Sequence, residues 1–254
     1  MAITLKSSRE IGIMRRAGAI VAEVLDLMRT AVRPGISLEE LDRLARELIE
    51  LRGGTPSFLG HQGFPSSICA SVDEEVVHGI PGLDVLDRGE IVSIDVGVLL
   101  DGYHADSALT LPVGAISDEA AKLIEITEAS FYRGIEHARS GQRIGDISAA
   151  IQAVAEQHGF GIVRELTGHG IGRSLWEDPQ IPNYGHAGTG PLLRPGMTIA
   201  VEPMFTTGDP STMVLEDGWT VVTVDGGLAA HYEHTVLITN GEPELLTKWE
   251  STVV

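Results

Sequence analysis

The 254-residue sequence predicts one α+β domain composed of two similar, pseudo-symmetric halves. Segments with helical periodicity occur in two pairs, and strand-like segments follow each pair. A shift of 106 residues aligns the glycines that follow the helices, Gly35 with Gly141 and Gly53 with Gly159. We expect the halves to span about residues 8–115 and 116–245, with a functional site between them.

In the first half, a helix is predicted over residues 8–30, where apolar residues recur three or four positions apart. Ser8 is its expected N-cap, and Arg33-Pro34-Gly35 ends it. Ser37-Leu38-Glu39-Glu40 has the form of a capping box, which predicts a second helix to about Leu51. Two short strands are expected next, at Ser67–Val72 and Glu75–His78.

The dipeptide Asp101-Gly102 lies between two apolar runs, which is the strongest short-range signal for a two-residue hairpin turn. With this turn, Asp106 lies opposite Gly97 in the hairpin. Side chains alternate along a strand, so Asp95 and Asp106 project from the same face, with their Cα atoms about 7–8 Å apart. Two carboxylates on one apolar face are costly unless a cation lies between them. The hairpin therefore predicts a bound cation.

The second half repeats the order of helices and strands. Ser117-Asp118-Glu119 is expected to begin a helix that continues to about Ala138, and a further helix is expected over Ile144–His158. The expected strands are Ile162–Leu166, Met197–Pro203, Val214–Leu215 with Trp219–Thr223, and His231–Thr239.

Composition excludes several classes of protein. The net charge of −18 argues against general binding to DNA or to anionic membranes, which requires a basic surface. No apolar run approaches the roughly 18 residues of a membrane span. The single cysteine cannot form an internal disulfide, and MAITLKSSREIG lacks the apolar core of a secretory signal. We therefore expect a cytoplasmic location.

Three more polar residues interrupt apolar segments in the second half: His169 in TGHGIG, Glu202 in TIAVEPM and Glu233 in EHTVLIT. Each alone has an ordinary explanation, as a loop histidine bonded to backbone or as a solvated glutamate at a strand end. Together with the two aspartates they form a set of four carboxylates and one imidazole, which suits Mn, Fe, Co or Zn. Two divalent cations would balance the charge of the carboxylates and would supply an activated water for hydrolysis.

Seven motifs, spread over nearly the whole chain, carry a family resemblance. They are VVHGIP at 76–81, SIDVG at 93–97, YHADSALT at 103–110, GHGIG at 168–172, VEPM at 201–204, EDGWTVVT at 216–223 and YEHTVLIT at 232–239. In these motifs the chain resembles the type I methionine aminopeptidases. The resemblance implies the pita-bread fold of the creatinase/aminopeptidase class, in which helices cover a curved antiparallel sheet.

The resemblance also implies roles for the polar residues. Asp106 and Glu233 would bridge two divalent ions (Co, Mn, Fe, Zn or Ni), Asp95 would bind one ion, and His169 and Glu202 the other. Glu202 would also shuttle the proton of the attacking water. His78 would contact the substrate backbone near the scissile bond; the alternative is a turn histidine bonded to nearby backbone.

A pocket for the substrate methionine is implied as well, because a flexible thioether favours aromatic contacts. Its expected lining is Phe58, His61, Phe64, Cys69, Leu175, Trp176 and Trp219. Phe64 and Trp219 could instead be ordinary core residues, and Cys69 is expected to be a packing residue, because no base is visibly paired with it.

Three residues depart from the family pattern. Trp176 occupies a position where the family usually has a histidine, and an indole N–H can donate a hydrogen bond but cannot accept one or titrate. His61 and Leu175 stand where tyrosine and phenylalanine are common. These departures put substrate positioning in doubt and suggest a divergent second copy of the enzyme.

The function implied by the resemblance is removal of the initiator methionine from nascent proteins with a small second residue. The expected partners are peptide and nascent-protein N-termini and, transiently, the ribosome; the protein itself is expected to be a monomer. Two alternatives remain open: an aminopeptidase of the same fold with another side-chain preference, and a non-catalytic binding module.

Overall fold

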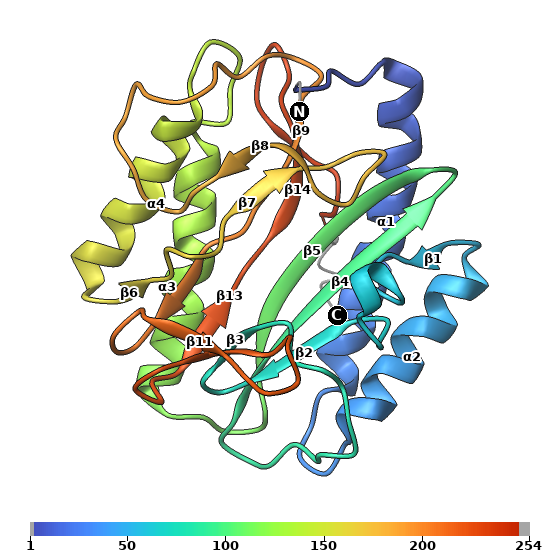
Figure 1. Ribbon diagram of the computed structural model, residues 1–254, viewed down its shortest axis with the longest axis vertical. Helices are drawn as coiled ribbons and strands as arrows, with labels where there is room; N and C mark the ends of the chain where they lie inside the picture. Colours follow the sequence, from blue (N-terminus) through green and yellow to red (C-terminus); the bar gives the residue numbers. More distant parts are fainter. Residues whose placement is uncertain (1–2, 249–254) are drawn as a thin grey trace.

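The computed structural model describes residues 3–248 and places two pairs of helices on opposite sides of the central strands (Figure 1). The first pair is α1 (Ser8–Ala31) with α2 (Leu38–Leu51), and the second is α3 (Asp118–Ile135) with α4 (Ile144–His158). Buried apolar side chains from all four helices belong to one core cluster. No helix within residues 3–248 has the length and apolar composition to cross a membrane.

The helix predictions are confirmed apart from details at their ends. The N-cap of α1 is Ser7 rather than Ser8, because the Ser7 backbone and the Glu10 side chain complete a capping box there. Helix α3 ends at Ile135, earlier than predicted. Its last residues are followed by tighter turns, in which Ala138 N donates to Ile135 O.

The predicted hairpin is confirmed in its register. It consists of β4 (Ile91–Leu100) and β5 (Tyr103–Pro112), and Gly97 is paired with Asp106. Asp101 and Gly102 both have positive φ angles, 47° and 80°, as the tight hairpin turn requires. Helix α1 packs on these two strands, and β1 (Thr55–Pro56) and β2 (Cys69–Val72) pair with β4.

The remaining strands form three further sheets. One contains β3 (Glu75–Val77), β11 (Thr212–Val214) and β12 (Val221–Thr223), and another β6 (Gly161–Ile162), β10 (Met204–Thr206) and β13 (Ala229–His231). The five-stranded sheet has the order β15 (Glu244–Leu245), β14 (His234–Leu237), β9 (Thr198–Val201), β7 (Gly168–Gly170) and β8 (Glu177–Ile181).

Several predicted strands are wrong in extent. Residues 162–166 form no strand beyond Ile162, because Arg164 N donates to the Glu165 side chain instead of to a neighbouring strand. The strand expected from Trp219 begins only at Val221, because the Asp217 side chain accepts hydrogen bonds from Trp219 N and Thr220 N in a turn. The strand predicted to begin at Ser67 is β2, which begins at Cys69, because the Ser67 N–H donates to the Asp42 carboxylate.

Two long predicted strands are interrupted at a glutamate: the strand expected over Met197–Pro203 ends at Val201, and the strand expected over His231–Thr239 is broken at Tyr232-Glu233. Between β9 and β10 the chain passes Glu202-Pro203, where proline has no N–H to donate and restricts the residue before it. Between β13 and β14 it passes Tyr232-Glu233, and Glu233 N donates instead to Ala108 O of β5 at 2.9 Å. The chain therefore changes sheets at both glutamates.

Candidate metal centre

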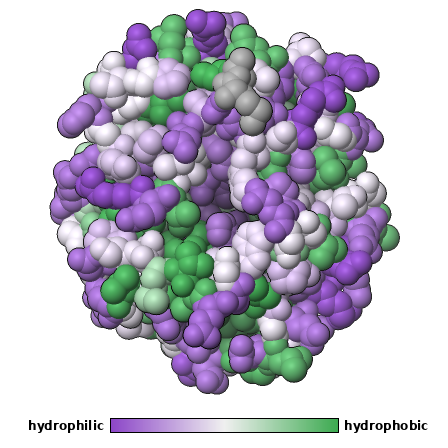
Figure 2. All heavy atoms as spheres, viewed as in Figure 1, coloured by the Kyte–Doolittle hydropathy of each residue, from purple (hydrophilic) through white to green (hydrophobic). Residues whose placement is uncertain are grey.

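The five predicted ligands converge on one hollow of about 440 Å³. Asp95 and Asp106 extend from β4 and β5, His169 from β7, Glu202 from the end of β9, and Glu233 from the residue before β14. The face of the molecule in Figure 2 is hollowed near its middle, where these strands meet in Figure 1. The hairpin supplies one wall and strands of the second half supply the other, as the sequence predicts.

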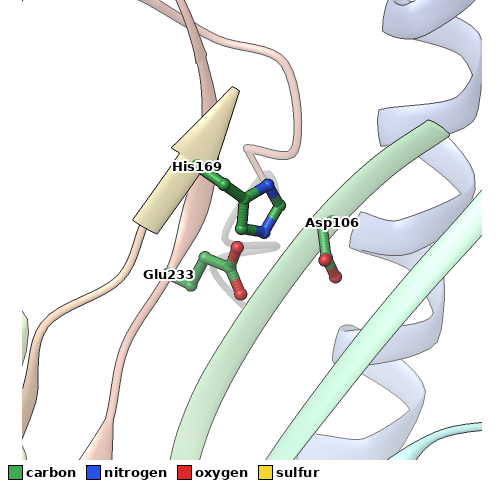
Figure 3. A group of neighbouring side chains, drawn as sticks. All are labelled: Asp106, His169 and Glu233. Atoms are coloured by element: carbon green, nitrogen blue, oxygen red, sulfur yellow. The ribbon is translucent and has the colours of Figure 1, made fainter. Parts of the chain in front are cut away.

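Three of the five residues form a group that could hold one metal ion. One ligand atom from each of Asp106, His169 and Glu233 lies within 4.8 Å of the others, and Figure 3 shows these side chains pointing toward one another. Glu202 joins them, with its Oε1 atom 3.5 Å from His169 Nε2. Asp95 Oδ1, Asp106 Oδ1 and Glu233 Oε1 are buried and have no hydrogen-bond partner among the described residues. Buried carboxylate oxygens without a donor are costly, and this donor set fits a divalent cation.

The pKa values of the five residues also indicate a site for divalent cations. Burial raises the pKa of Asp95 to about 7. Burial, and then the charge of neighbouring carboxylates, raise the pKa values of Asp106, Glu202 and Glu233 well above their usual range. Burial lowers the pKa of His169 to about 4, so its imidazole is neutral, the form that binds metals. Cations would relieve the mutual repulsion of the carboxylates.

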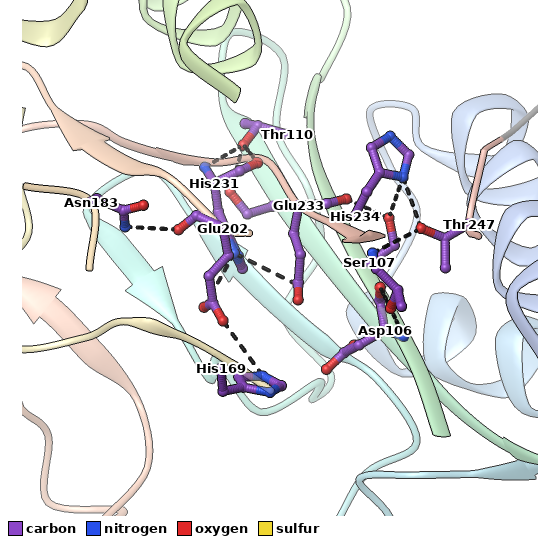
Figure 4. A network of polar contacts seen from close by, with 12 residues as sticks. Asp106, Ser107, Thr110, His169, Asn183, Glu202, His231, Glu233, His234 and Thr247 are labelled. Carbon is purple, nitrogen blue, oxygen red and sulfur yellow. Dashed lines mark hydrogen bonds and ion pairs between the residues drawn. The ribbon is translucent and has the colours of Figure 1, made fainter. Parts of the chain in front are cut away.

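Hydrogen bonds from neighbouring segments fix the backbone and rings that carry these ligands. His169 Nδ1 lies 2.9 Å from Gly170 O, which leaves Nε2 facing Glu202. Thr235 Oγ1 accepts from Asp106 N at 2.9 Å and donates to Asp106 O at 2.8 Å. Figure 4 shows Asn183 Nδ2 donating to Glu202 O at 2.9 Å. Such supporting contacts hold ligands in a geometry suited to a metal.

Sequence reasoning missed His231, which also lines the hollow. Its Nε2 atom is buried and has no hydrogen-bond partner within residues 3–248, and it lies 3.8 Å from Glu202 Oε2 and 3.9 Å from Glu233 Oε2 (Figure 4). The available signal was its position two residues before Glu233, which places both side chains on one face of an extended segment. Asn183 carried no comparable signal, because its contact with Glu202 joins segments that are distant in sequence.

The predicted substrate-binding residues line the same hollow. They are Phe58, His61, Phe64, Cys69, His78, Leu175, Trp176 and Trp219. The rings of Phe64 and Trp219 meet edge to face with centroids 5.2 Å apart, and those of His61 and Trp176 at 4.9 Å. Trp176 is 41% exposed, at the mouth of the hollow. Burial and the nearby aspartates raise the pKa of the Cys69 thiol, which agrees with a packing role.

A buried ion pair organises the segment that carries Leu175 and Trp176. Glu177 accepts hydrogen bonds from Lys6 Nζ at 2.6 Å, Thr4 Oγ1 at 2.7 Å and Arg173 N at 2.8 Å. Burial tends to raise the pKa of Glu177, but the hydrogen bonds from Lys6 and Thr4 outweigh it and lower the pKa overall. The N-terminal segment thereby braces one wall of the hollow.

Replacing Lys6 by methionine is expected to destabilise the protein by about 3 kcal/mol, because the Glu177 carboxylate is then left buried without its cation. Urea unfolding measures the change. The matched control is Arg16→Met, which removes an exposed pair with Asp101 (side chains 60% and 59% exposed) and is expected to cost less than about 1 kcal/mol. Equal losses in the two variants would show that the buried pair has no special role.

Comparisons with known proteins identify the family of this chain. The model of metallopeptidase family M24 matches residues 12–240. A methionine aminopeptidase of Clostridium perfringens is 54% identical, with coverage of 96% of this chain and 98% of the relative. Methionine aminopeptidase 1 of Bacillus subtilis is 52% identical, with coverage of 97% and 99%. The crystal structure of a methionine aminopeptidase from Thermotoga maritima superposes with a TM-score of 0.96 at 44% identity, covering 97% of this chain and 100% of that one.

Proposed function

Because the chain belongs to metallopeptidase family M24, we propose that it is a methionine aminopeptidase, a hydrolase that releases methionine from the N-termini of peptides and nascent proteins. The observation that carries the proposal is the convergence of Asp95, Asp106, His169, Glu202 and Glu233 beside an apolar hollow. The ligand set argues against a non-catalytic binding module, because none of the five predicted residues is missing.

We propose that this set holds two divalent ions, since their charge balances that of the four carboxylates. Asp106 and Glu233 would contact both ions, Asp95 one of them, and His169 with Glu202 the other. When bound, such ions polarise a carbonyl oxygen and lower the pKa of a coordinated water. The oxygen-rich set with one imidazole is compatible with Co, Mn, Fe, Zn or Ni.

The protein's own residues would then move protons and orient the substrate. Glu202 lines the hollow, and its carboxylate would accept the proton of the attacking water and pass it to the leaving amine. Burial lowers the pKa of His78, so a neutral His78 would be available to contact the peptide backbone. Phe64 and Trp219 would line the slot for the methionine side chain.

The decisive experiment is a cleavage assay with the peptide Met-Ala-Ser after the protein has been loaded with Mn or Co. We expect release of free methionine, and an intact peptide would refute the proposal. The alternative, an aminopeptidase with another preference, is motivated by His61, Leu175 and Trp176. A panel of X-Ala-Ser peptides separates the two, because the alternative requires methionine to rank below leucine or phenylalanine.

Replacing Trp176 by histidine is expected to raise kcat/KM for Met-Ala-Ser by about tenfold, which is worth about 1.4 kcal/mol. An imidazole can accept as well as donate a hydrogen bond, whereas the indole can only donate. Trp176→Phe is the control, because it keeps an aromatic ring beside His61 but removes the N–H. A histidine variant no faster than the phenylalanine variant would contradict a role for this position in orienting the peptide.

We propose that the protein acts in the cytoplasm as a monomer. The single cysteine, which cannot form an internal disulfide, is compatible with a reducing compartment, where the protein would meet nascent chains by transient association with the ribosome.

A further inference from the structure

A second hollow adjoins the candidate active site. It has a volume of about 560 Å³ and lies between strand β8, the start of α4 and the segment of residues 182–191. Asp178 and Gln180 of β8 line both hollows, whereas Pro179 between them lines only the second. Strand β8 is therefore the partition between the hollows, and in Figure 1 it lies between β7 and α4.

The partition is only one strand thick and ends its sheet. Strand β8 is the last strand in the order β15-β14-β9-β7-β8, so within residues 3–248 no strand pairs with its outer side. Neighbouring strands lie about 4.7–4.9 Å apart, and an extended chain advances about 3.3–3.6 Å per residue. An extended peptide leaving the active site would therefore cross β8 within one or two residues.

The lining of the second hollow suits a polypeptide rather than a charged small molecule. Pro182, Tyr184 and Pro191 supply apolar and aromatic surface, and Gly185 and Gly190 add no side chain to the lining. Asp178 is the one side chain with a formal charge among the residues that line it. The guanidinium of Arg164 covers the Tyr184 ring at 4.5 Å, which holds this wall in place.

We propose that the second hollow binds the substrate polypeptide from about its fourth residue onward, with a preference for apolar side chains. The inference rests on the proposed function, because the occupant is the downstream part of the chain whose first residue is cleaved. A tripeptide would end near β8 and leave the hollow empty, whereas a longer chain would fill it. Peptide length beyond three residues should then affect binding more than the chemical step.

The experiment compares Met-Ala-Ser with Met-Ala-Ser-Leu-Leu-Ala on the wild type and on Pro191→Trp, which adds a ring in the second hollow. The wild type is expected to have a KM about tenfold lower for the hexapeptide. Pro191→Trp should raise that KM about tenfold and leave kcat and KM for the tripeptide within about twofold. Leu192→Trp is the matched control: the side chain is 40% exposed, is the next residue and does not line the hollow.

Tyr184→Ala is a second variant, which removes a wall instead of blocking the space and should raise the hexapeptide KM several-fold. Equal KM values for the two peptides on the wild type would overturn the inference, as would equal effects of the tryptophans at 191 and 192. Either result would leave the proposed aminopeptidase function standing, because both peptides would still be cleaved. Failure to cleave both peptides would instead refute the proposed function.

Discussion

The Asp106→Asn variant is expected to lose at least about 10³-fold in metal-dependent peptide cleavage, a barrier increase of about 4 kcal/mol, while its metal-free form becomes more stable. Asp106 is 3% exposed, and its Oδ1 has no hydrogen-bond partner among the described residues. The amide keeps the shape of the side chain but cannot ionise, which removes the cost of burying a carboxyl beside Glu233 and Asp95. At pH 8 we expect the free energy of unfolding of the metal-free protein to rise by about 1–2 kcal/mol.

Cleavage of Met-Ala-Ser and urea unfolding after chelation measure the two effects. Asp101→Asn is a matched control, because it makes the same substitution at the exposed turn of the same hairpin. It is expected to change the free energy of unfolding by less than about 0.5 kcal/mol and to leave cleavage unchanged. If Asp106→Asn cleaved peptide at the wild-type rate, or lost stability without metal, the role given to Asp106 would be wrong.

The metal-free protein is expected to lose stability as the pH rises from about 6.5 to 9. Asp95 has a pKa of about 7 in the folded protein against 3.8 as an ordinary aspartate, and burial also raises the pKa values of Asp106, Glu202 and Glu233 well above their usual range. A folded state that binds more protons than the unfolded state loses stability with rising pH. Each carboxyl that remains protonated contributes about 1.4 kcal/mol per pH unit.

The buried histidines increase the free energy of unfolding as the pH rises, but only below about pH 6.5. Burial lowers the pKa values of His169 and His231 to about 4 and about 3, so the unfolded state binds the additional protons up to about pH 6.5. The two effects oppose each other below that pH, and above it only the carboxyls contribute. We therefore expect the stability of the metal-free protein to fall more steeply above about pH 6.5, where the histidines no longer offset the carboxyls.

Urea unfolding between pH 6.5 and 9, with chelator or with saturating Mn, checks this expectation. Metal ions bind the ionised carboxylates, so the loaded protein should show a much weaker fall with pH and a higher free energy of unfolding throughout. Asp106→Asn should reduce the slope of the chelated protein. A chelated protein whose stability is flat or increases above pH 7 would show that the carboxyls are not the source of the dependence.

Much of the fold follows from local sequence. The four helices have apolar residues at helical spacing and begin at cap residues or after turns, so their positions are correct to within a few residues. Asp101-Gly102 determines the register of β4 and β5, and this register alone places Asp95 and Asp106 on one face. These features depend on residues close together in the chain, which is why they can be predicted without tertiary information.

The strands of the second half are different, because their ends depend on partners that are distant in sequence. The break at Tyr232-Glu233 exists because Glu233 pairs with Ala108 of β5, more than a hundred residues earlier. The pairing of β13 with β10, in which His231 lies opposite Met204, likewise brings His231 beside Glu202, a contact between segments that are distant in sequence.

By itself the sequence determined the fold class, the helices, the hairpin and the identity of the candidate ligands, because each depends on local pattern or on a family motif. Only the tertiary structure decided how these residues meet. It placed the unpartnered carboxylate oxygens together, positioned Trp176 at the mouth through its contact with His61, and set a second hollow behind β8. The physical reason is that burial, repulsion between charges and the shape of a cavity belong to the packed chain, and no single segment contains them.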